Sequence, residues 1–182
     1  MAHVVGWGVV EDGMNESIRS AIEEASGWVR QHPDEARYTD SPATARIDSG
    51  LRVMVSGPND EGVTTDMPSA VGGAGSAASP GWLFRASLAA CVVSLATMRA
   101  AQLGVTGFSC EADVDSESDD RGILGLDDDV PAGPLSIRIA FRMSADEVDG
   151  AALTAIGNWA VDHCPVSEGA SRAVPIRIEV NS

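Results

Sequence analysis

The amino-acid sequence predicts an α+β fold rather than a doubly wound sheet. Residues 80–102 form one long apolar run with helical character, and the segments around it alternate apolar and polar residues with the period of a strand. The predicted elements follow the order strands, buried helix, strands, helix, strand. This order places strands in adjacent hairpins, which is typical of α+β proteins.

The N-terminal part predicts a helix over residues 14–31. Apolar residues near helical spacing (Ile18, Ile22, Ala25 and Val29) define one face, and the step His32-Pro33 ends the helix. Asn15 is the expected N-cap. We interpret residues 1–43 as a helical appendage with its linker, and residues 44–182 as the main domain.

The first strands of the main domain are predicted around a tight turn. Leu51, Val53 and Val55 alternate with polar neighbours, and the turn "GPNDEG" leads into a second short strand near 62–66. The glycine-rich loop "PSAVGGAGSAAS" is predicted to be a flexible approach to the long helix. Ser79 caps that helix and Pro80 is its first residue. Because the helix is apolar nearly all round, we expect it to be central and buried.

The second half predicts two strands, a helix and a last strand. Residues 108–115 and 135–143 alternate and are separated by a long acidic turn. Ser144 and Glu147 have the spacing of a capping box and predict a helix that ends at His163-Cys164-Pro165. Its apolar face contains Val148, Ala152, Ile156 and Trp159. A short turn or helix follows, and residues 174–180 alternate as a final strand.

Composition excludes several classes of function. The net charge of −15 argues against nucleic-acid partners and anionic membrane surfaces, both of which need basic residues. All 12 basic residues are arginine, so Schiff-base and phosphate-loop chemistry, which requires lysine, is excluded. The opening residues do not resemble a signal peptide, and the most apolar window, 86–98, is too short to span a bilayer. Together with three cysteines, these features predict a cytoplasmic, reducing location.

Three other motifs are disfavoured as sites. The pattern Gly73-x-Gly75-x-x-Ala78 follows a poor strand, unlike a dinucleotide fingerprint. The acidic stretch 113–120 lacks the glycine and glutamate of a calcium loop and is expected to be a solvated strand and turn. A zinc site from His163, Cys164 and Cys91 lacks paired ligand spacing. We therefore expect no metal or bound cofactor, and we expect His163 to be a helix-end residue.

The three cysteines have different surroundings. Cys110 lies among apolar residues of a strand, where core packing is expected. Cys91 lies on the most apolar helix and, taken alone, is more often a small core residue. Cys164 stands at the end of the other long helix of the main domain. Two crossing central helices would place the thiols of Cys91 and Cys164 within disulfide reach.

The two cysteine segments resemble the OsmC/Ohr family, the osmotically induced and organic hydroperoxide resistance proteins. "SPGWLFRASLAACVVSLATMRAAQLGV" is similar to the family's first cysteine helix, and "DHCPVSEGA" resembles its second cysteine motif. The loop before the first helix and the later "DDRGILG" fit the same pattern. The resemblance covers roughly residues 44–180.

The resemblance implies antiparallel sheets around two central helices in an intertwined homodimer. It also implies a cysteine-based peroxidase that acts on organic hydroperoxides in the oxidative stress response. Cys91 would attack the peroxide, Cys164 would form a disulfide with it, and an external dithiol such as a lipoyl group would reduce that disulfide. The alternative function is a non-catalytic protein of this fold that binds a small apolar ligand at the dimer interface. A purely structural dimer is a third candidate.

One feature departs from the family pattern. The family stabilises its thiolate with an arginine, which is held by a glutamate directly after the helix-capping proline; here that position is Gly81. Arg52 matches the arginine best by order along the chain, and Arg85 and Arg46 are alternatives. Glu168 would be a substitute for the missing acid.

Overall fold

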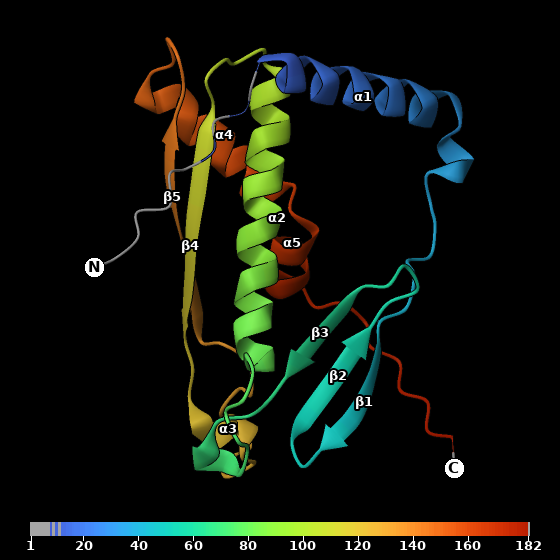
Figure 1. Ribbon diagram of the computed structural model, residues 1–182, viewed down its shortest axis with the longest axis vertical. Coiled ribbons are helices and arrows are strands. Elements are labelled where there is room, and N and C mark those ends of the chain that lie inside the picture. Colours follow the sequence, from blue (N-terminus) through green and yellow to red (C-terminus); the bar gives the residue numbers. More distant parts are fainter. Residues whose placement is uncertain (1–7, 9, 11, 182) are drawn as a thin grey trace. The chain divides into compact units, whose positions relative to one another are not determined.

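The computed structural model describes residues 8, 10 and 12–181, and Figure 1 labels their helices and strands. The chain divides into two compact units. The first contains residues 1–24 and 87–182, and the second contains residues 25–86. Helix α1 (Asp12–Gln31) and helix α2 (Pro80–Gln102) each contribute residues to both units. The architecture is α+β with antiparallel sheets, as the sequence predicts.

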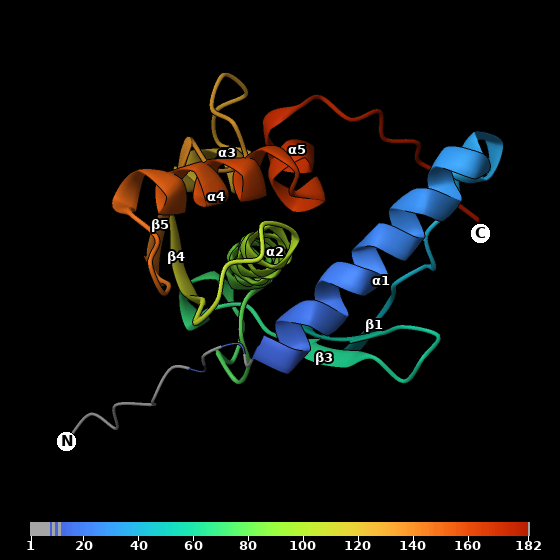
Figure 2. The ribbon, with the colours of Figure 1, turned by 90° about the horizontal axis from the view of Figure 1, so that it is seen from above.

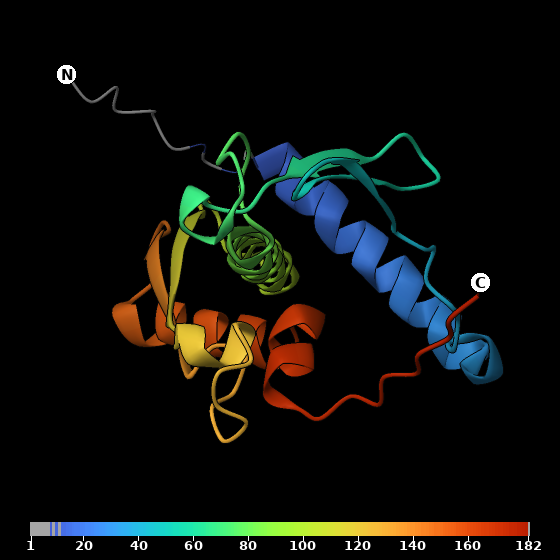
Figure 3. The ribbon, with the colours of Figure 1, turned by 90° about the horizontal axis from the view of Figure 1, so that it is seen from below.

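The first unit is built around a long hairpin and helix α2. Strands β4 (Ser109–Glu117) and β5 (Ser136–Ser144) pair antiparallel, from Ser109 opposite Ser144 to Glu117 opposite Ser136. Helices α4 (Gly150–Asp162) and α5 (Pro165–Ser171) follow the hairpin. Figures 2 and 3 view α2 almost end-on, with the hairpin on one side of it and α4 and α5 on another.

Two buried clusters form the core of this unit. In one cluster, Ala96 and Ala100 of α2 pack with Ile156 and Ala160 of α4 and with Phe108. In the other, Leu88 and Val92 of α2 pack with Cys164 against apolar residues of β4 and β5. The side chains of α2 and α4 thus share one buried cluster, and Cys164, after the end of α4, joins the other cluster on α2.

Helix α2 is less covered than its sequence predicts. Its buried residues are Leu88, Val92, Ala96, Ala100 and Ala101, and only 17% of its most apolar window is buried. The expectation of a helix buried on all sides is therefore wrong for a single chain, because the described elements fully bury only one face and leave most of the other residues partly exposed. With 23 residues, α2 is also long and apolar enough to cross a membrane by length and composition, contrary to the estimate from window 86–98. A core helix of a soluble protein passes the same test, so this is weak evidence for a membrane span.

The second unit contains a three-stranded antiparallel sheet in the order β1-β2-β3. Its strands are β1 (Thr44–Ser49), β2 (Arg52–Ser56) and β3 (Gly62–Thr65). The hairpin of β2 and β3 confirms the predicted pair of strands. Strand β1 was not predicted, because all six of its residues are exposed and its only strong apolar residue is Ile47. Short 3-10 turns, η1 (Pro33–Glu35) and η2 (Ser69–Val71), complete this unit.

The N-terminal helix is confirmed, but its predicted cap is wrong. Helix α1 already begins at Asp12, so Asn15 lies inside it. The Asn15 side chain is buried and donates a hydrogen bond from Nδ2 to the carbonyl of Val105. This bond ties the start of α1 to the turn after α2. A buried amide finds its partner in the tertiary structure, which local capping patterns do not reveal.

Two other predictions near the C-terminus are also wrong. Helix α4 begins at Gly150 with Asp149 as its N-cap, because Glu147 has a positive φ of 54° and interrupts any helix from Ser144. Residues 174–180 form no strand in the described chain. Their apolar side chains instead lie exposed, with Ile176, Ile178 and Val180 each at least 84% accessible. A strand requires a neighbouring edge to pair with, and no described segment supplies one.

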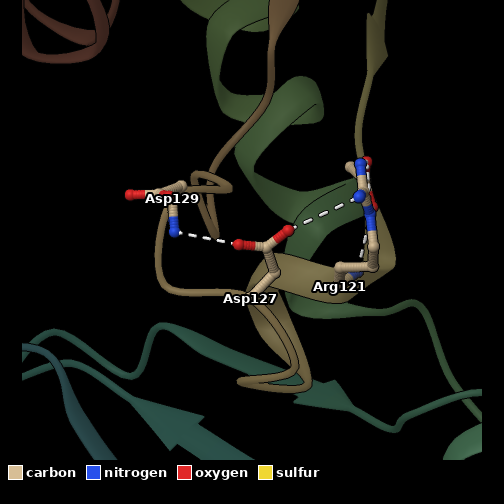
Figure 4. A network of polar contacts seen from close by, with 4 residues as sticks. Arg121, Asp127 and Asp129 are labelled. Atoms are coloured by element: carbon tan, nitrogen blue, oxygen red, sulfur yellow. Dashed lines mark hydrogen bonds and ion pairs between the residues drawn. The ribbon is translucent and has the colours of Figure 1, made fainter.

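The acidic region between β4 and β5 is a solvated turn, as predicted. It contains the short helix α3 (Asp120–Ile123), which Asp119 caps. Arg121 pairs with Asp127 at 3.5 Å, and the backbone N–H of Asp129 donates to the same carboxylate (Figure 4). On the strands themselves, arginines pair with the acidic side chains at exposed positions.

The glycine-rich loop before α2 is held by hydrogen bonds, so the expectation of a flexible approach is wrong. The N–H of Gly73 donates to the carbonyl of Pro68, and the N–H of Gly75 donates to that of Met67. A Cβ atom at Gly73 would lie 1.8 Å from the carbonyl oxygen of Met67. Only glycine fits this close approach of two backbone segments.

We expect Gly73→Ala to lower the free energy of unfolding by about 3 kcal/mol, because the loop backbone must move to accept the methyl group. Gly81→Ala is the matched control. Its Cβ would meet no atom closer than 4.0 Å, and alanine in a helix is favoured by up to about 1 kcal/mol over glycine. Urea unfolding of both variants checks this. An unchanged midpoint for Gly73→Ala would contradict the geometry of the loop.

Candidate active site: a pair of cysteines

The structure brings Cys91 and Cys164 together. Cys91 lies in the middle of α2 and Cys164 lies between α4 and α5, and both belong to the cluster around Leu88 and Val92. Cys164 is near enough to Cys91 to raise the pKa of its thiol, and both are free cysteines. Residues 73 positions apart in the chain thus lie together as two thiols in one apolar cluster.

Cys164 is fixed by the junction of two helices. Helix α4 ends at Asp162, and Pro165 is the first residue of α5, so Cys164 serves as the N-cap of α5. Its Sγ accepts a hydrogen bond from the backbone N–H of Ser167 at 3.3 Å, and its side chain is fully buried. The Cys-Pro step therefore does more than end a helix: it starts the next one with the sulfur directed at that helix's N–H groups.

The surroundings of Cys91 oppose its ionisation. Burial raises the pKa of the Cys91 thiol above its ordinary value, and the neighbouring Cys164 raises this pKa further. A hydrogen bond from the backbone N–H of Val166, in the first turn of α5, acts in the opposite direction and lowers the pKa. A reactive thiolate at Cys91 therefore requires a further positive group.

Cys110 is separate from this pair, as predicted. It packs on β4 against the cluster around Phe108 and Ile156. Burial, and secondarily the charge of Glu111, raise the pKa of its thiol to about 11. At neutral pH Cys110 is therefore a neutral core thiol.

His163 is a helix-end residue, as predicted. Its Nδ1 lies 2.8 Å from the carbonyl oxygen of Trp159, and its ring stacks on the Trp159 ring with centroids 4.1 Å apart. The guanidinium of Arg99 also lies over the Trp159 ring, 5.1 Å from its centroid. Among the described residues no group of three His, Cys, Asp or Glu side chains could hold a metal ion. His3 lies outside the described residues.

The three candidate arginines have different surroundings. Arg52, at the start of β2, donates from Nε to Asp48 at 2.9 Å and from Nη1 to the Ser76 hydroxyl at 2.8 Å. Arg85 lies one turn after Gly81 on α2, and its Nη1 would be 4.0 Å from a Cβ at position 81. Arg46 lies exposed on the edge strand β1. The guanidinium of Arg52 thus bonds to two different segments, strand β1 through Asp48 and the glycine-rich loop through Ser76.

Glu168, the predicted substitute acid, has another partner. Its carboxylate pairs with Arg172, one turn later along the chain, with Nε and Oε1 3.1 Å apart. Both side chains are about 60% exposed, so this is a surface ion pair of helix α5.

The fold is α+β, with one cysteine in a long central helix and a second cysteine at a helix junction beside it. This combination is that of a dithiol protein of the OsmC type. The sequence model for "OsmC-like protein" matches residues 73–179, which is more than half of the chain. The protein belongs to the OsmC-like family. The boundary between appendage and domain at residues 43 and 44 stays a prediction.

Solved structures with the same fold include organic hydroperoxide resistance proteins. One, from Legionella pneumophila, is 20% identical and has a TM-score of 0.52, with 72% of this chain and 89% of that chain covered. Another, from Elizabethkingia anophelis, is 19% identical with a TM-score of 0.53 and coverages of 75% and 90%. An OsmC-like protein of unknown function from Vibrio cholerae is 11% identical, with a TM-score of 0.54 and coverages of 72% and 93%. A search of curated proteins found no match.

Sequence reasoning missed the residues that hold Arg52. Asp66 and Ser76 lie in and beside the loop that looked like a simple approach to α2, and no motif marks them. The one available signal was a lone aspartate at the end of the short second strand, in "TTDMP", where a buried and unpaired carboxylate would be costly.

Proposed function

We propose that this protein is a cysteine-based peroxidase that reduces organic hydroperoxides to alcohols. The observation that carries the proposal is the dithiol: Cys91 of α2 and Cys164, the N-cap of α5, belong to the same apolar cluster. An apolar environment favours organic hydroperoxides over hydrogen peroxide. Membership of the OsmC-like family, and the names of the relatives with this fold, support the same activity.

The proposed reaction balances with two thiols and one external reductant. The Cys91 thiolate attacks the terminal oxygen of the hydroperoxide, the O–O bond breaks, and the alkoxide takes a proton and leaves as the alcohol. Cys91 is then a sulfenic acid. The Cys164 sulfur attacks it, a Cys91–Cys164 disulfide forms, and water leaves. A dithiol such as a lipoyl group returns both cysteines to thiols by exchange.

Arg52 is the proposed positive group for Cys91. Such a group is necessary because the pKa of the Cys91 thiol is raised. The Val166 N–H lowers this pKa, but less than burial and Cys164 raise it. Arginine suits this role because its guanidinium stays charged and presents several donors in a fixed plane. The variant Arg52→Lys, compared with Arg46→Lys and Arg85→Lys, separates the three candidates by the rate of Cys91 oxidation.

The proposed active form is a cytoplasmic homodimer. A single chain leaves most of the apolar helix α2 only partly buried, and the alternating segment 174–180 has its isoleucines exposed. A second copy of the chain would cover both. Such a dimer would bury more than about 2,000 Å² in total, as obligate interfaces do.

We expect Gly81→Glu to raise the rate with organic hydroperoxides and to lower the pKa of the Cys91 thiol. Position 81 has room for a side chain, and the nearest cation is Arg85, four residues along the same helix. A carboxylate at position 81 would orient a guanidinium within its reach, since charge-assisted pairs fix geometry. Alkylation kinetics of Cys91 against pH give the pKa.

The double variant Gly81→Glu/Arg85→Ala shows which arginine responds. If the gain disappears in the double variant, Arg85 is the oriented residue. If the gain persists, the new acid acts on another arginine. No change in rate or pKa for Gly81→Glu would contradict the expectation.

The stoichiometry of thiol loss tests the proposed function. Under one equivalent of cumene hydroperoxide, two thiols per chain should be lost and one should remain, and peptide mapping should show Cys91 bonded to Cys164. Hydrogen peroxide should act more slowly. If neither peroxide oxidises the pair, the activity is absent, and the binding of a small apolar ligand becomes the leading function. The raised pKa of Cys91 and the glycine at position 81 are the observations that favour this second candidate.

A further inference from the structure

We propose that Asp66 and Ser76 are positioning residues that hold the Arg52 guanidinium in one orientation, in place of an acid at position 81. The inference rests on the proposed function, in which Arg52 serves Cys91. It is drawn from contacts within the second unit, where all three residues lie.

A directed chain of hydrogen bonds joins these residues. The Ser76 hydroxyl donates its proton to Oδ2 of Asp66 at 2.8 Å and accepts from Nη1 of Arg52, also at 2.8 Å. A hydroxyl has one proton, so donating it to the carboxylate leaves its lone pairs for the guanidinium. The charge of Asp66 thus fixes the direction of the Ser76 hydroxyl, and Ser76 in turn receives Arg52.

Asp66 is built to remain an anion in this position. Its side chain is only 2% exposed and also accepts from the backbone N–H groups of Met67 and Ser76 at 2.8 and 2.9 Å. These bonds, those from Ser76 above all, hold the pKa of Asp66 below its ordinary value. A buried carboxylate with this many donors has one orientation, because turning it would break several bonds at once.

Arg52 is held from two sides. Asp48 accepts from Nε at 2.9 Å, and Ser76 accepts from Nη1. The remaining nitrogen, Nη2, has no hydrogen-bond partner among the described residues. The guanidinium borders a cleft of about 270 Å³, whose lining includes Asp66, Ser76 and the backbone of Gly73. Because two of its nitrogens are already hydrogen-bonded, the guanidinium is held in place, and its third nitrogen can donate to an anion without rotation of the side chain.

The variant Ser76→Ala tests the positioning role. It removes both hydrogen bonds of the hydroxyl. The backbone N–H of residue 76 still donates to Asp66, so the loop stays attached to this carboxylate. We expect the rate of Cys91 oxidation by cumene hydroperoxide to fall about tenfold, with a higher pKa of the Cys91 thiol. Ser76→Thr, which keeps a hydroxyl, should restore both. Ser69→Ala, in the same loop, is the control and should match the wild type.

A second measurement does not depend on activity. The Nη–H signals of Arg52 in an NMR spectrum, assigned by their loss in Arg52→Lys, should exchange slowly with water in the wild type and faster in Ser76→Ala, which removes the acceptor of Nη1. If the wild type reduces no hydroperoxide but exchange is still faster in Ser76→Ala than in the wild type, the positioning role stands and only the proposed function is overturned. Unchanged exchange in Ser76→Ala, or an unchanged rate and thiol pKa in an active protein, would overturn the positioning role.

Discussion

Cys91→Ser should abolish hydroperoxide reduction, with a loss of ~10³-fold or more, because a serine hydroxyl is not ionised near neutral pH and attacks peroxides poorly. Cys164→Ser should behave differently. It should consume one equivalent of hydroperoxide per chain and then stop, since the sulfenic acid at Cys91 has no neighbouring thiol with which to form a disulfide. The measurement is hydroperoxide consumption in the presence of dihydrolipoamide, with single-turnover kinetics in its absence.

Cys110→Ser is the matched control for both variants. The Cys110 thiol belongs to the other buried cluster, and burial raises its pKa to about 11, so it should contribute nothing to the reaction. Its loss should leave the rate unchanged. If Cys91→Ser retained the wild-type rate, or if Cys110→Ser lost it, the assignment of the dithiol as the reactive centre would be wrong.

The second large effect concerns assembly. We expect the wild type to be a dimer at micromolar concentration, and we expect the paired change Ile176→Asp/Ile178→Asp to weaken that dimer at least about 100-fold. These two isoleucines are 85% and 84% exposed in the single chain. Placing a carboxylate at each would forfeit the apolar burial that a partner chain provides and would add the cost of desolvating two charges. Sedimentation velocity over a range of concentrations gives the change.

The same segment supplies the control. In an extended segment, neighbouring side chains point to opposite sides, so Arg177 and Glu179 lie on the face away from the isoleucines. Arg177→Ser/Glu179→Ser should leave the dimer intact. An equal effect of both pairs would argue that the segment does not dock as a strand. A wild type that is monomeric at micromolar concentration would refute the dimer itself.

Elements with strong local signals could be predicted from the sequence. Ser79 caps α2 as expected, since its Oγ accepts from the N–H of Trp82 at 3.2 Å, and Pro80 is the first helical residue. The hairpin of β4 and β5 follows its alternating pattern over nine residues on each strand. These features depend on backbone geometry and on nearby residues, which a local pattern reveals.

Features that depend on distant partners could not be predicted. Asn15 looks like a helix cap but donates to Val105, 90 residues away. Ser144 and Glu147 have the spacing of a capping box, yet Glu147 adopts a positive φ and Asp149 caps the helix instead. The segment 174–180 alternates like a strand but has no described edge to pair with. In each case the local pattern predicts a hydrogen-bond partner nearby in the sequence, whereas the actual partner depends on the tertiary structure.

The sequence by itself determined that this chain is an α+β protein with a cysteine in its most apolar helix and a second cysteine at a Cys-Pro helix boundary. Only the tertiary structure decided that these two thiols meet while Cys110 packs elsewhere, and that Arg52 is held through Ser76 by a buried Asp66. The reason is physical. Helix and strand periods follow from neighbouring residues, whereas the contacts of a thiol or a buried carboxylate depend on which faces pack together, and close packing fixes this over the whole chain at once.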